Sequence, residues 1–395
     1  MKEGWQTRSL GDVAEIGAGN SAPQAERLFE GGTHPFFRTA DAGRIRFGDI
    51  YESGDYLNDE GIRGLRRFPK GTILLPKSGA STFLNHRVML GVEGFVSSHL
   101  ATIVADEAQV DRRFLLYFLT TISAQDMIQD HAYPSLNLPN IAGIRVLIPP
   151  LSEQRRIVGI LDEAFDCIAT AKANAEKNLQ NARALFESHL QSVFTQCGKG
   201  WKQKTLEEIA TTFGRGKSKH RPRNEPKLYG GEYPFIQTGD IRNADHFITE
   251  YSQTYSEAGL AQSKLWPKGT ICITIAANIA ETGILGFDAC FPDSVIGVVA
   301  NPKEAEVGFI EYLLQSFKAR LQAMGKGSAQ ANINMGTFEN ERFPFPSVAE
   351  QKQTVAQLDE LREETQRLAS LYERKLAALE ALKKSLLHQA FTGEL

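Results

Sequence analysis

The stretch LSEQRRIVGILDE, residues 151–163, returns as VAEQKQTVAQLDE at residues 348–360. Each copy opens a long run of helix-forming residues, and the runs close similarly, with SVFTQ at 192–196 and QAFTGEL at 389–395. A period of 197 residues is far longer than that of a solenoid repeat. It indicates a duplicated unit, a domain followed by a helix, and therefore approximate internal two-fold symmetry.

The duplication extends into the segments that precede each helix. HPFFRTADAGR from His34 matches YPFIQTGDIRN from Tyr233, and FPKGTILL from Phe68 matches WPKGTICI from Trp266. Between these anchors the copies diverge in sequence and in loop length. A shared scaffold with divergent loops is expected when two domains do the same job on different targets. Plain duplication with drift leaves the same pattern, so the residues alone leave both interpretations open.

Both helical runs carry a heptad pattern of apolar residues, which predicts a helix packed along its length on another helix. In the first run the predicted interface holds small residues such as Ala175 and Ala182, and in the second it holds bulky leucines. Small side chains on one helix against large side chains on the other favour pairing of the two helices within one chain. Two-fold symmetry favours an antiparallel pair. A parallel homodimer is the alternative. The residues predicted at the helix-pair interface are Ile157, Leu161, Ile168, Leu185, Leu358, Leu361, Leu368, Leu379, Leu382 and Leu386.

The sequences before the helices mix short apolar runs with turns, which predicts two α/β domains without the regular strand–helix alternation of a doubly wound enzyme. We therefore expect a first domain over 1–150, a helix over 151–197, a second domain over 198–346 and a last helix over 347–395.

The composition of the chain is that of a folded protein, with 395 residues, 42% hydrophobic content and a net charge of −3. No apolar run approaches the ~18 residues that cross a bilayer, and the first residues do not resemble a signal peptide. Four cysteines and eight histidines show no zinc-ligand spacing. A cytoplasmic protein with no metal site is the expectation.

Positive charge gathers in two segments in spite of the negative total. Residues 215–227, RGKSKHRPRNEPK, hold six Lys or Arg against one Glu, and residues 63–70, RGLRRFPK, hold four against none. Such local patches can supply contacts to DNA phosphates. Solvated loops carry similar runs of charge, so this signal alone does not decide.

Three segments resemble catalytic motifs and fail on inspection. Residues 15–20, EIGAGN, resemble a glycine loop that binds S-adenosylmethionine, but no clear helix follows. GRGKS at Gly214 lacks the first glycine of a phosphate-binding loop, since Thr211 stands in its place. IPPL at Ile148 lacks the acidic or amide residue of the DPPY-type methyltransferase motif. We expect no catalytic residue in this chain.

The paired IPPLSEQRRIVGILDE and PFPSVAEQKQTVAQLDE, each after a diverged domain, resemble the specificity subunit of type I restriction-modification enzymes. The closing HQAFTGEL and the segment NIAETGILGFD at 278–288 fit the same family. The resemblance implies two target-recognition domains, each reading one half of an asymmetric bipartite site on double-stranded DNA. It also implies helices that hold the domains apart as a ruler.

The same resemblance implies partners and cofactors outside the chain. Two modification subunits that bind S-adenosylmethionine and methylate adenine would dock on the helices, and restriction subunits that use ATP and Mg would be a further partner. KSGASTFLNHRV at 77–88 lacks the AANIAETG pattern of 276–283, so the two domains should read different half-sites.

Candidate DNA contacts are polar and basic loop residues at matched places in the copies, because Gln and Asn can pair with adenine and Arg or Lys with guanine. In the first domain they are Ser21, Arg38, Thr39, Lys77, Ser78 and Ser81, and in the second Lys217, Lys219, Arg221, Gln237, Thr238, Arg242 and Asn278. Two other functions stay open: a structural or oligomerisation protein that does not bind DNA, and a single-chain DNA methyltransferase or nuclease.

Overall fold

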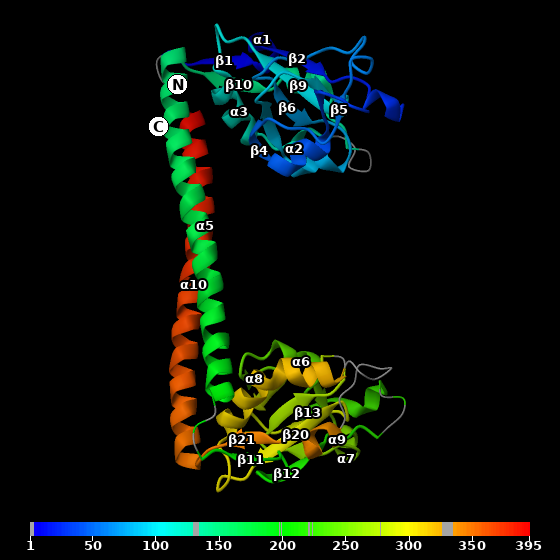
Figure 1. The fold of residues 1–395 in the computed structure, drawn as a ribbon, viewed down its shortest axis with the longest axis vertical. Helices are drawn as coiled ribbons and strands as arrows, with labels where there is room; N and C mark the ends of the chain where they lie inside the picture. Colours follow the sequence, from blue (N-terminus) through cyan, green and yellow to red (C-terminus); the bar gives the residue numbers. More distant parts are fainter. Residues whose placement is uncertain are drawn as a thin grey trace. The chain divides into compact units, whose positions relative to one another are not determined.

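A computed structural model describes residues 4–128, 134–196, 198, 200–219, 222, 224–276, 278–325 and 335–395. The chain forms two compact units. Unit 1 comprises Met1–Ala175 with Arg374–Leu395, and unit 2 comprises Glu176–Glu373. Each unit therefore holds one α/β domain together with a segment of each long helix, α5 (Leu151–Gln196) and α10 (Val348–Thr392) (Figure 1). The unit boundaries fall within both long helices.

The first domain is built on a five-stranded sheet of order β2-β9-β6-β7-β4, a three-stranded sheet β5-β3-β8 and the pair β1-β10. Its strands are β1 Gln6–Ser9, β2 Ala14–Ala18, β3 His34–Phe37, β4 Phe47–Ile50, β5 Tyr56–Leu57, β6 Ile73–Pro76, β7 Arg87–Leu90, β8 Phe95–Val96, β9 Leu100–Ala105 and β10 Arg145–Ile148. Its helices are α1 Leu10–Val13, α2 Thr39–Ile45, α3 Arg112–Thr120 and α4 Leu138–Ala142, with 3₁₀ turns at Glu26–Leu28, Ala80–Leu84 and Gln125–Met127.

The second domain repeats this topology, with a five-stranded sheet of order β12-β20-β17-β18-β14, the sheet β15-β13-β19-β16 and the pair β11-β21. Its strands are β11 Lys202–Lys204, β12 Ala210–Arg215, β13 Tyr229–Phe235, β14 Phe247–Ile248, β15 Gln253–Tyr255, β16 Leu265–Trp266, β17 Ile271–Thr274, β18 Thr282–Leu285, β19 Ala289–Cys290, β20 Val295–Ala300 and β21 Phe343–Phe345. Its helices are α6 Thr238–Asn243, α7 Glu257–Ala261, α8 Val307–Gly325 and α9 Met335–Asn340, with a 3₁₀ turn at Pro226–Leu228.

The helix that packs on each five-stranded sheet, α3 or α8, carries the main core of its domain. In α3 every residue from Phe114 to Leu119 is buried. The sequence favours a helix over 112–129, but α3 ends at Thr120. The hydroxyls of Thr120 and Thr121 bond back to the carbonyls of Tyr117 (2.6 Å) and Phe118 (2.7 Å). Such side-chain bonds compete with helical ones, and β-branched residues are poor helix formers, so the helix stops there.

The far end of one copy's helix completes the core of the other copy's domain. In unit 1, Phe391 near the end of α10 contacts Phe114 and Phe118 of α3, with ring centroids 5.1 and 5.5 Å apart. In unit 2, Phe194 near the end of α5 contacts Phe309 of α8 at 5.2 Å. Each core therefore includes apolar side chains from both halves of the sequence.

Within each unit the two helices run antiparallel. In unit 1, Arg156 of α5 bonds the carbonyl of Leu395 (2.8 Å), and Lys172 pairs with Glu380 (2.5 Å). In unit 2, Arg183 pairs with Glu373 (2.8 Å). As the residue numbers on α5 rise from 156 to 183, those of their partners fall from 395 to 373, as antiparallel packing requires. The predicted fold class, two similar α/β domains with two long antiparallel helices, is confirmed.

One series of buried positions on each helix recurs every seven residues, as in a left-handed coiled coil. The series is Gln154, Leu161, Ile168, Ala175 and Ala182 on α5, and Gln351, Leu358 and Thr365 on α10. Of the other residues predicted at the interface, Ile157 is buried, while Leu361, Leu379 and Leu386 are half-buried.

Three leucines predicted at the interface lie on the outer surface instead. Leu185 is 51% exposed, Leu368 36% and Leu382 47%. On α5 the buried face passes to half-buried Phe186, because an α-helix drifts steadily relative to a strict 3.5-residue repeat. On α10 the buried position between Leu361 and Leu368 is taken by Thr365, whose hydroxyl bonds the carbonyl of Leu361 (2.9 Å).

A buried glutamine joins each domain to the helix that follows it. The side-chain oxygen of Gln154 accepts from the Asp111 amide (2.7 Å), and its nitrogen donates to the carbonyls of Pro149 (2.8 Å) and Gln109 (3.1 Å). Gln351 repeats the pattern in unit 2, with the Glu306 amide and the carbonyls of Pro346 and Glu304. These bonds explain why both helix openings hold a glutamine at this position.

Gln154→Ala should destabilise the chain by about 2 kcal/mol, because it leaves one buried amide and two carbonyls without partners. Urea unfolding followed by circular dichroism measures the change. Gln180→Ala, at an exposed position of the same helix, is the matched control and should change stability little. Equal midpoints for the two variants would contradict the anchoring role of Gln154.

Candidate nucleic-acid interface

A turn of three residues, Ser97–His99, gathers the candidate loops of the first domain. The Ser97 amide donates to the carbonyl of Phe37, next to Arg38 (2.9 Å), and the Ser98 amide donates to that of Asn20, next to Ser21 (2.7 Å). These two bonds bring the loop of Ser21 and the start of α2, with Arg38 and Thr39, to one place.

The same turn holds the segment after β6. The Lys77 amide donates to the His99 carbonyl (2.9 Å), and Ser78 Oγ is hydrogen-bonded to His99 Nδ1 (2.7 Å). Ser81 lies on the following 3₁₀ turn, with its hydroxyl 3.4 Å from the Ser78 carbonyl. His99 is exposed and was not among the predicted contacts. Its only sequence signal is its position just before β9.

The second domain has the equivalent turn at Pro292–Ser294, before β20. The Gly216 amide donates to the Val295 carbonyl (2.9 Å), and the Ile275 amide donates to that of Ser294 (3.0 Å). Arg215 Nε donates to the carbonyl of Asp293 (2.7 Å). The start of the basic segment 215–227 and the segment after β17 therefore meet as their counterparts do in the first domain.

Two glycines of the apparent catalytic motifs have a packing role in these turns. A Cβ on Gly19 would lie 2.3 Å from the carbonyl oxygens of Val96 and Ser97, and a Cβ on Gly216 would lie 2.2 Å from that of Phe291. No side chain fits at such distances. Both glycines are required because two backbones approach closely.

The residues that open α2 and α6 are held in place by neighbours. Arg38 forms an ion pair with Asp55 and lies over the rings of Phe29 (5.8 Å) and Phe36 (5.3 Å). Gln237 Nε2 donates to Gln253 Oε1 (2.8 Å). Thr39 and Thr238, the first residues of α2 and α6, are half-buried.

Arg242 and Asn278 come together although they are far apart in the sequence. Arg242 Nη1 lies 3.4 Å from Asn278 Oδ1 in a hydrogen bond, and the Thr274 hydroxyl donates to the Asn278 carbonyl. Arg242 is exposed and Asn278 half-buried. An Arg and an Asn side by side match the donor and acceptor pattern of base edges in the major groove.

Several lysines keep their charge open to solvent. Lys217 and Lys219 are exposed and Lys77 is half-buried, and none of the three forms an ion pair within the described part of the chain. Ser21 is exposed as well. Arg221 lies outside the described residues. By contrast, two of the four cations in the segment 63–70 are neutralised, because Arg66 pairs with Glu15 (2.7 Å) and Arg67 with Glu93 (2.8 Å).

Lys264 adds a cation that the sequence did not single out. Its ammonium lies 3.6 Å from the ring centroid of Trp266. Partial burial, and then repulsion by Lys217, lower the pKa of Lys264. Two neighbouring lysines that repel each other would both gain from an anion between them, so this pair is suited to a phosphate.

In the ranges that the structure covers, no cluster of three His, Cys, Asp or Glu could hold a metal ion. No helix in those ranges combines the length and apolar character needed to span a membrane.

Comparison with known proteins agrees with this duplicated geometry of two α/β domains and two helices. The family model described as "Type I restriction modification DNA specificity domain" matches twice, at residues 2–181 and 198–373. The class is thus a two-domain DNA-specificity protein. This chain belongs to the type I restriction-modification DNA specificity family.

Relatives named as specificity subunits align over most of the chain. The S.MpnORF507P subunit of Mycoplasma pneumoniae is 24% identical over 361 residues, covering 90% of this chain and 89% of its own. The MjaX subunit of Methanocaldococcus jannaschii is 20% identical over 317 residues, covering 75% and 71%.

Solved structures share the fold. One, from work on complex assembly and conformational transition of the type I R-M system, has a TM-score of 0.80 at 18% identity and covers 100% of this chain and 99% of its own. The HsdS subunit of Thermoanaerobacter tengcongensis has a TM-score of 0.67 at 18% identity, covering 100% and 98%.

Lys217→Gln and Lys264→Gln should each weaken DNA binding by the assembled complex similarly on all sequences. Each should also reduce the slope of log affinity against log salt by about one, as expected for a lost phosphate contact. Titration of labelled duplexes at several salt concentrations measures both. Lys204→Gln is the control, since Lys204 pairs with Glu304 (2.5 Å). An unchanged slope for both test variants would rule out the phosphate site.

Proposed function

We propose that this chain is the non-catalytic DNA-recognition subunit of a type I restriction-modification complex, and that its two domains bind the halves of an asymmetric bipartite site. The observation that supports this most directly is the pair of equivalent turns, Ser97–His99 and Pro292–Ser294. Each gathers polar and basic loops at the same edge of a five-stranded sheet of the same strand order. A fixed frame with variable side chains at one edge is what sequence-specific recognition requires.

The side chains at matched positions of the two edges differ in chemistry. Where the first domain has exposed His99, the second has half-buried Ser294, and the counterpart of half-buried Lys77 is Ile275, which is buried in the core. An imidazole and a hydroxyl favour different base edges, and a lysine is present at this place in the first domain alone. The two half-sites should therefore differ in sequence.

The outer surface of the helices supports docking of two modification subunits. Leu368 and Leu371, three residues apart on α10 within unit 2, are 36% and 49% exposed, and Leu185 and Leu382 are exposed as well. Neighbouring apolar side chains on a surface mark protein–protein contacts. In this proposal the helices also set the spacing of the half-sites. S-adenosylmethionine would bind in the modification subunits, and ATP and Mg in restriction subunits where these join the complex.

The decisive experiment is long-read methylation sequencing of DNA from cells that express this chain with its neighbouring modification subunit. We expect a new methyladenine motif in two unequal halves with a fixed gap. Cells that express the modification subunit alone are the control. An assembled complex that produces no new motif would contradict the proposal and favour a structural role without DNA recognition.

Docking is tested separately with the double variant Leu368→Asn/Leu371→Asn. Removing two exposed apolar side chains from one face of α10 should weaken binding of the modification subunit at least about tenfold. Pull-down with purified modification subunit gives the affinity. Glu363→Asn, at an exposed position of the same helix, is the matched control. Equal binding by both variants would mean that this face is not the docking surface.

A further inference from the structure

We propose that complementary side chains make α5 pair preferentially with α10, and disfavour a pair of two α5 helices or of two α10 helices. We call this set of complementary contacts the pairing code. Because of it, α5 would pair with α10 even when two copies of the chain exchange their halves. This selectivity belongs to the helix pair alone and does not depend on DNA recognition. Four contacts between the helices, two in each unit, provide it, and the 197-residue repeat relates their positions.

Two of these contacts are cation–π pairs between a cation on α10 and an aromatic ring on α5. In unit 1, Lys383 of α10 lies over Phe165 of α5 (4.9 Å) and over Phe47 of β4 (5.7 Å). In unit 2, Arg362 of α10 lies over Phe186 of α5 (5.0 Å) and over Tyr312 of α8 (5.2 Å).

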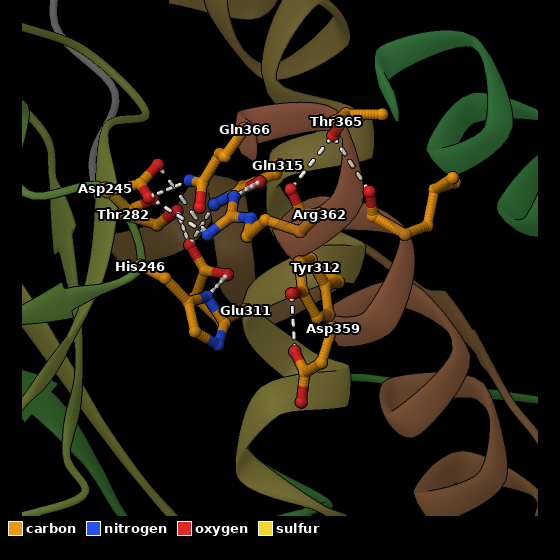
Figure 2. A network of polar contacts seen from close by, with 11 residues as sticks. Asp245, His246, Thr282, Glu311, Tyr312, Gln315, Asp359, Arg362, Thr365 and Gln366 are labelled. Carbon is orange, nitrogen blue, oxygen red and sulfur yellow. Dashed lines mark hydrogen bonds and ion pairs between the residues drawn. The ribbon is translucent and has the colours of Figure 1, made fainter. Parts of the chain in front are cut away.

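Positions 165 and 362 are equivalent in the repeat, and so are 186 and 383. Both aromatic partners are therefore on α5 and both cations on α10. Figure 2 shows Arg362 reaching from α10 toward Gln315 and Asp245 of the second domain, where its guanidinium donates to Gln315 Oε1 (3.2 Å) and the Asp245 carbonyl (3.1 Å). These bonds fix the orientation of the cation over its rings.

The other two contacts are ion pairs. Lys172 pairs with Glu380 in unit 1, and Arg183 pairs with Glu373 in unit 2. The hydrogen bond from Lys172 lowers the pKa of Glu380, which keeps this carboxylate charged. Positions 183 and 380 are equivalent in the repeat and carry opposite charges. Here the bases lie on α5 and the acids on α10.

Replacing either helix by a second copy of its partner breaks this complementarity. In an α10–α10 pair, Arg362 would face Lys383 and Glu373 would face Glu380, so both contacts would join like charges. In an α5–α5 pair, Lys172 would face Arg183, and Phe165 would face Phe186 with no cation. Arg183 would gain one acid, Glu176. The code therefore excludes the α10 self-pair most strongly.

The preference for the α5–α10 pair comes from the sum of several weak contacts rather than from any one of them. An exposed ion pair changes an equilibrium constant only a few-fold, and a cation–π pair contributes a similar amount. In a two-fold self-pair of α10 each like-charge contact occurs twice. Four unfavourable contacts should therefore disfavour this self-pair by at least about tenfold relative to α5–α10.

The test uses the full chain with a protease site inserted after Gly198 and cleaved once the protein has folded. Cleaved protein with natural isotopes is mixed with a heavy-isotope preparation, in enough urea that the heavy and light halves exchange. After dilution, native mass spectrometry counts the pairs. We expect pairs of one first half with one second half, heavy and light in any combination, and second-half self-pairs at least about tenfold below the statistical share.

A variant that erases the code is the matched comparison. Phe186→Arg with Arg362→Phe exchanges cation and ring in unit 2, and Arg183→Glu with Glu373→Lys reverses one ion pair. Every α5–α10 contact stays complementary, but both contacts of an α10 self-pair become complementary too. Second-half self-pairs should then appear close to their statistical share. The ion-pair reversal alone, which keeps Arg362 in place, should give an intermediate share.

Two results would overturn the proposal. One is second-half self-pairs at the statistical share in the natural sequence. The other is their absence from both variants after the isotope labels have exchanged fully.

Discussion

The constraint on which the structure depends is that neither half of the sequence can complete its own core. Buried Ala390 and half-buried Phe391, the latter against Phe114, complete the first domain's core, and buried Phe194 fills the second domain's core against Phe309. Each of these rings comes from the helix that follows the other domain. Burial of an aromatic side chain is among the largest single contributions to a core. The long helices are thus structural members of both domains, and the buried Gln154 and Gln351 fix where each helix leaves its own domain.

On this common frame the two copies have diverged even inside the core. Leu116 of α3 corresponds to Glu311 of α8, which is fully buried and bonded to His246 (2.7 Å) and Thr282 (2.9 Å), as Figure 2 shows. The first domain instead buries Arg87 at the position of Thr282, and its guanidinium donates to the Leu119 and Ile122 carbonyls at the end of α3. Desolvation lowers the pKa of Arg87 to about 10. Each buried polar side chain is hydrogen-bonded locally, so the frame tolerates the change.

The sequence was sufficient to predict the duplication, the two α/β domains and the antiparallel helices, because a repeat and a heptad pattern are properties of the chain alone. It could not place Leu185 on the surface and Phe186 on the inner face. The buried face of α5 moves by one residue there, and this shift depends on the helix and the domain surface against which α5 packs. Nor could it find His99 or Lys264, whose surroundings arise from contacts between distant segments. The roles of Gly19 and Gly216 were hidden for the same reason: a close backbone approach leaves no periodic trace.

The composition of the two units also bears on the order in which the protein can be made. Unit 2 is continuous in sequence, Glu176–Glu373, and all of it is synthesised before residues 374–395. Unit 1 joins residues 1–175 to 374–395, so its core is completed only after residues 374–395 have been made, even though its domain precedes unit 2 in the sequence. During that interval the surface that Phe391 later covers is open to solvent and to other chains. A protein whose first domain is completed only after its second has been made should depend on chaperones, which shield incomplete cores while the chain is still on the ribosome.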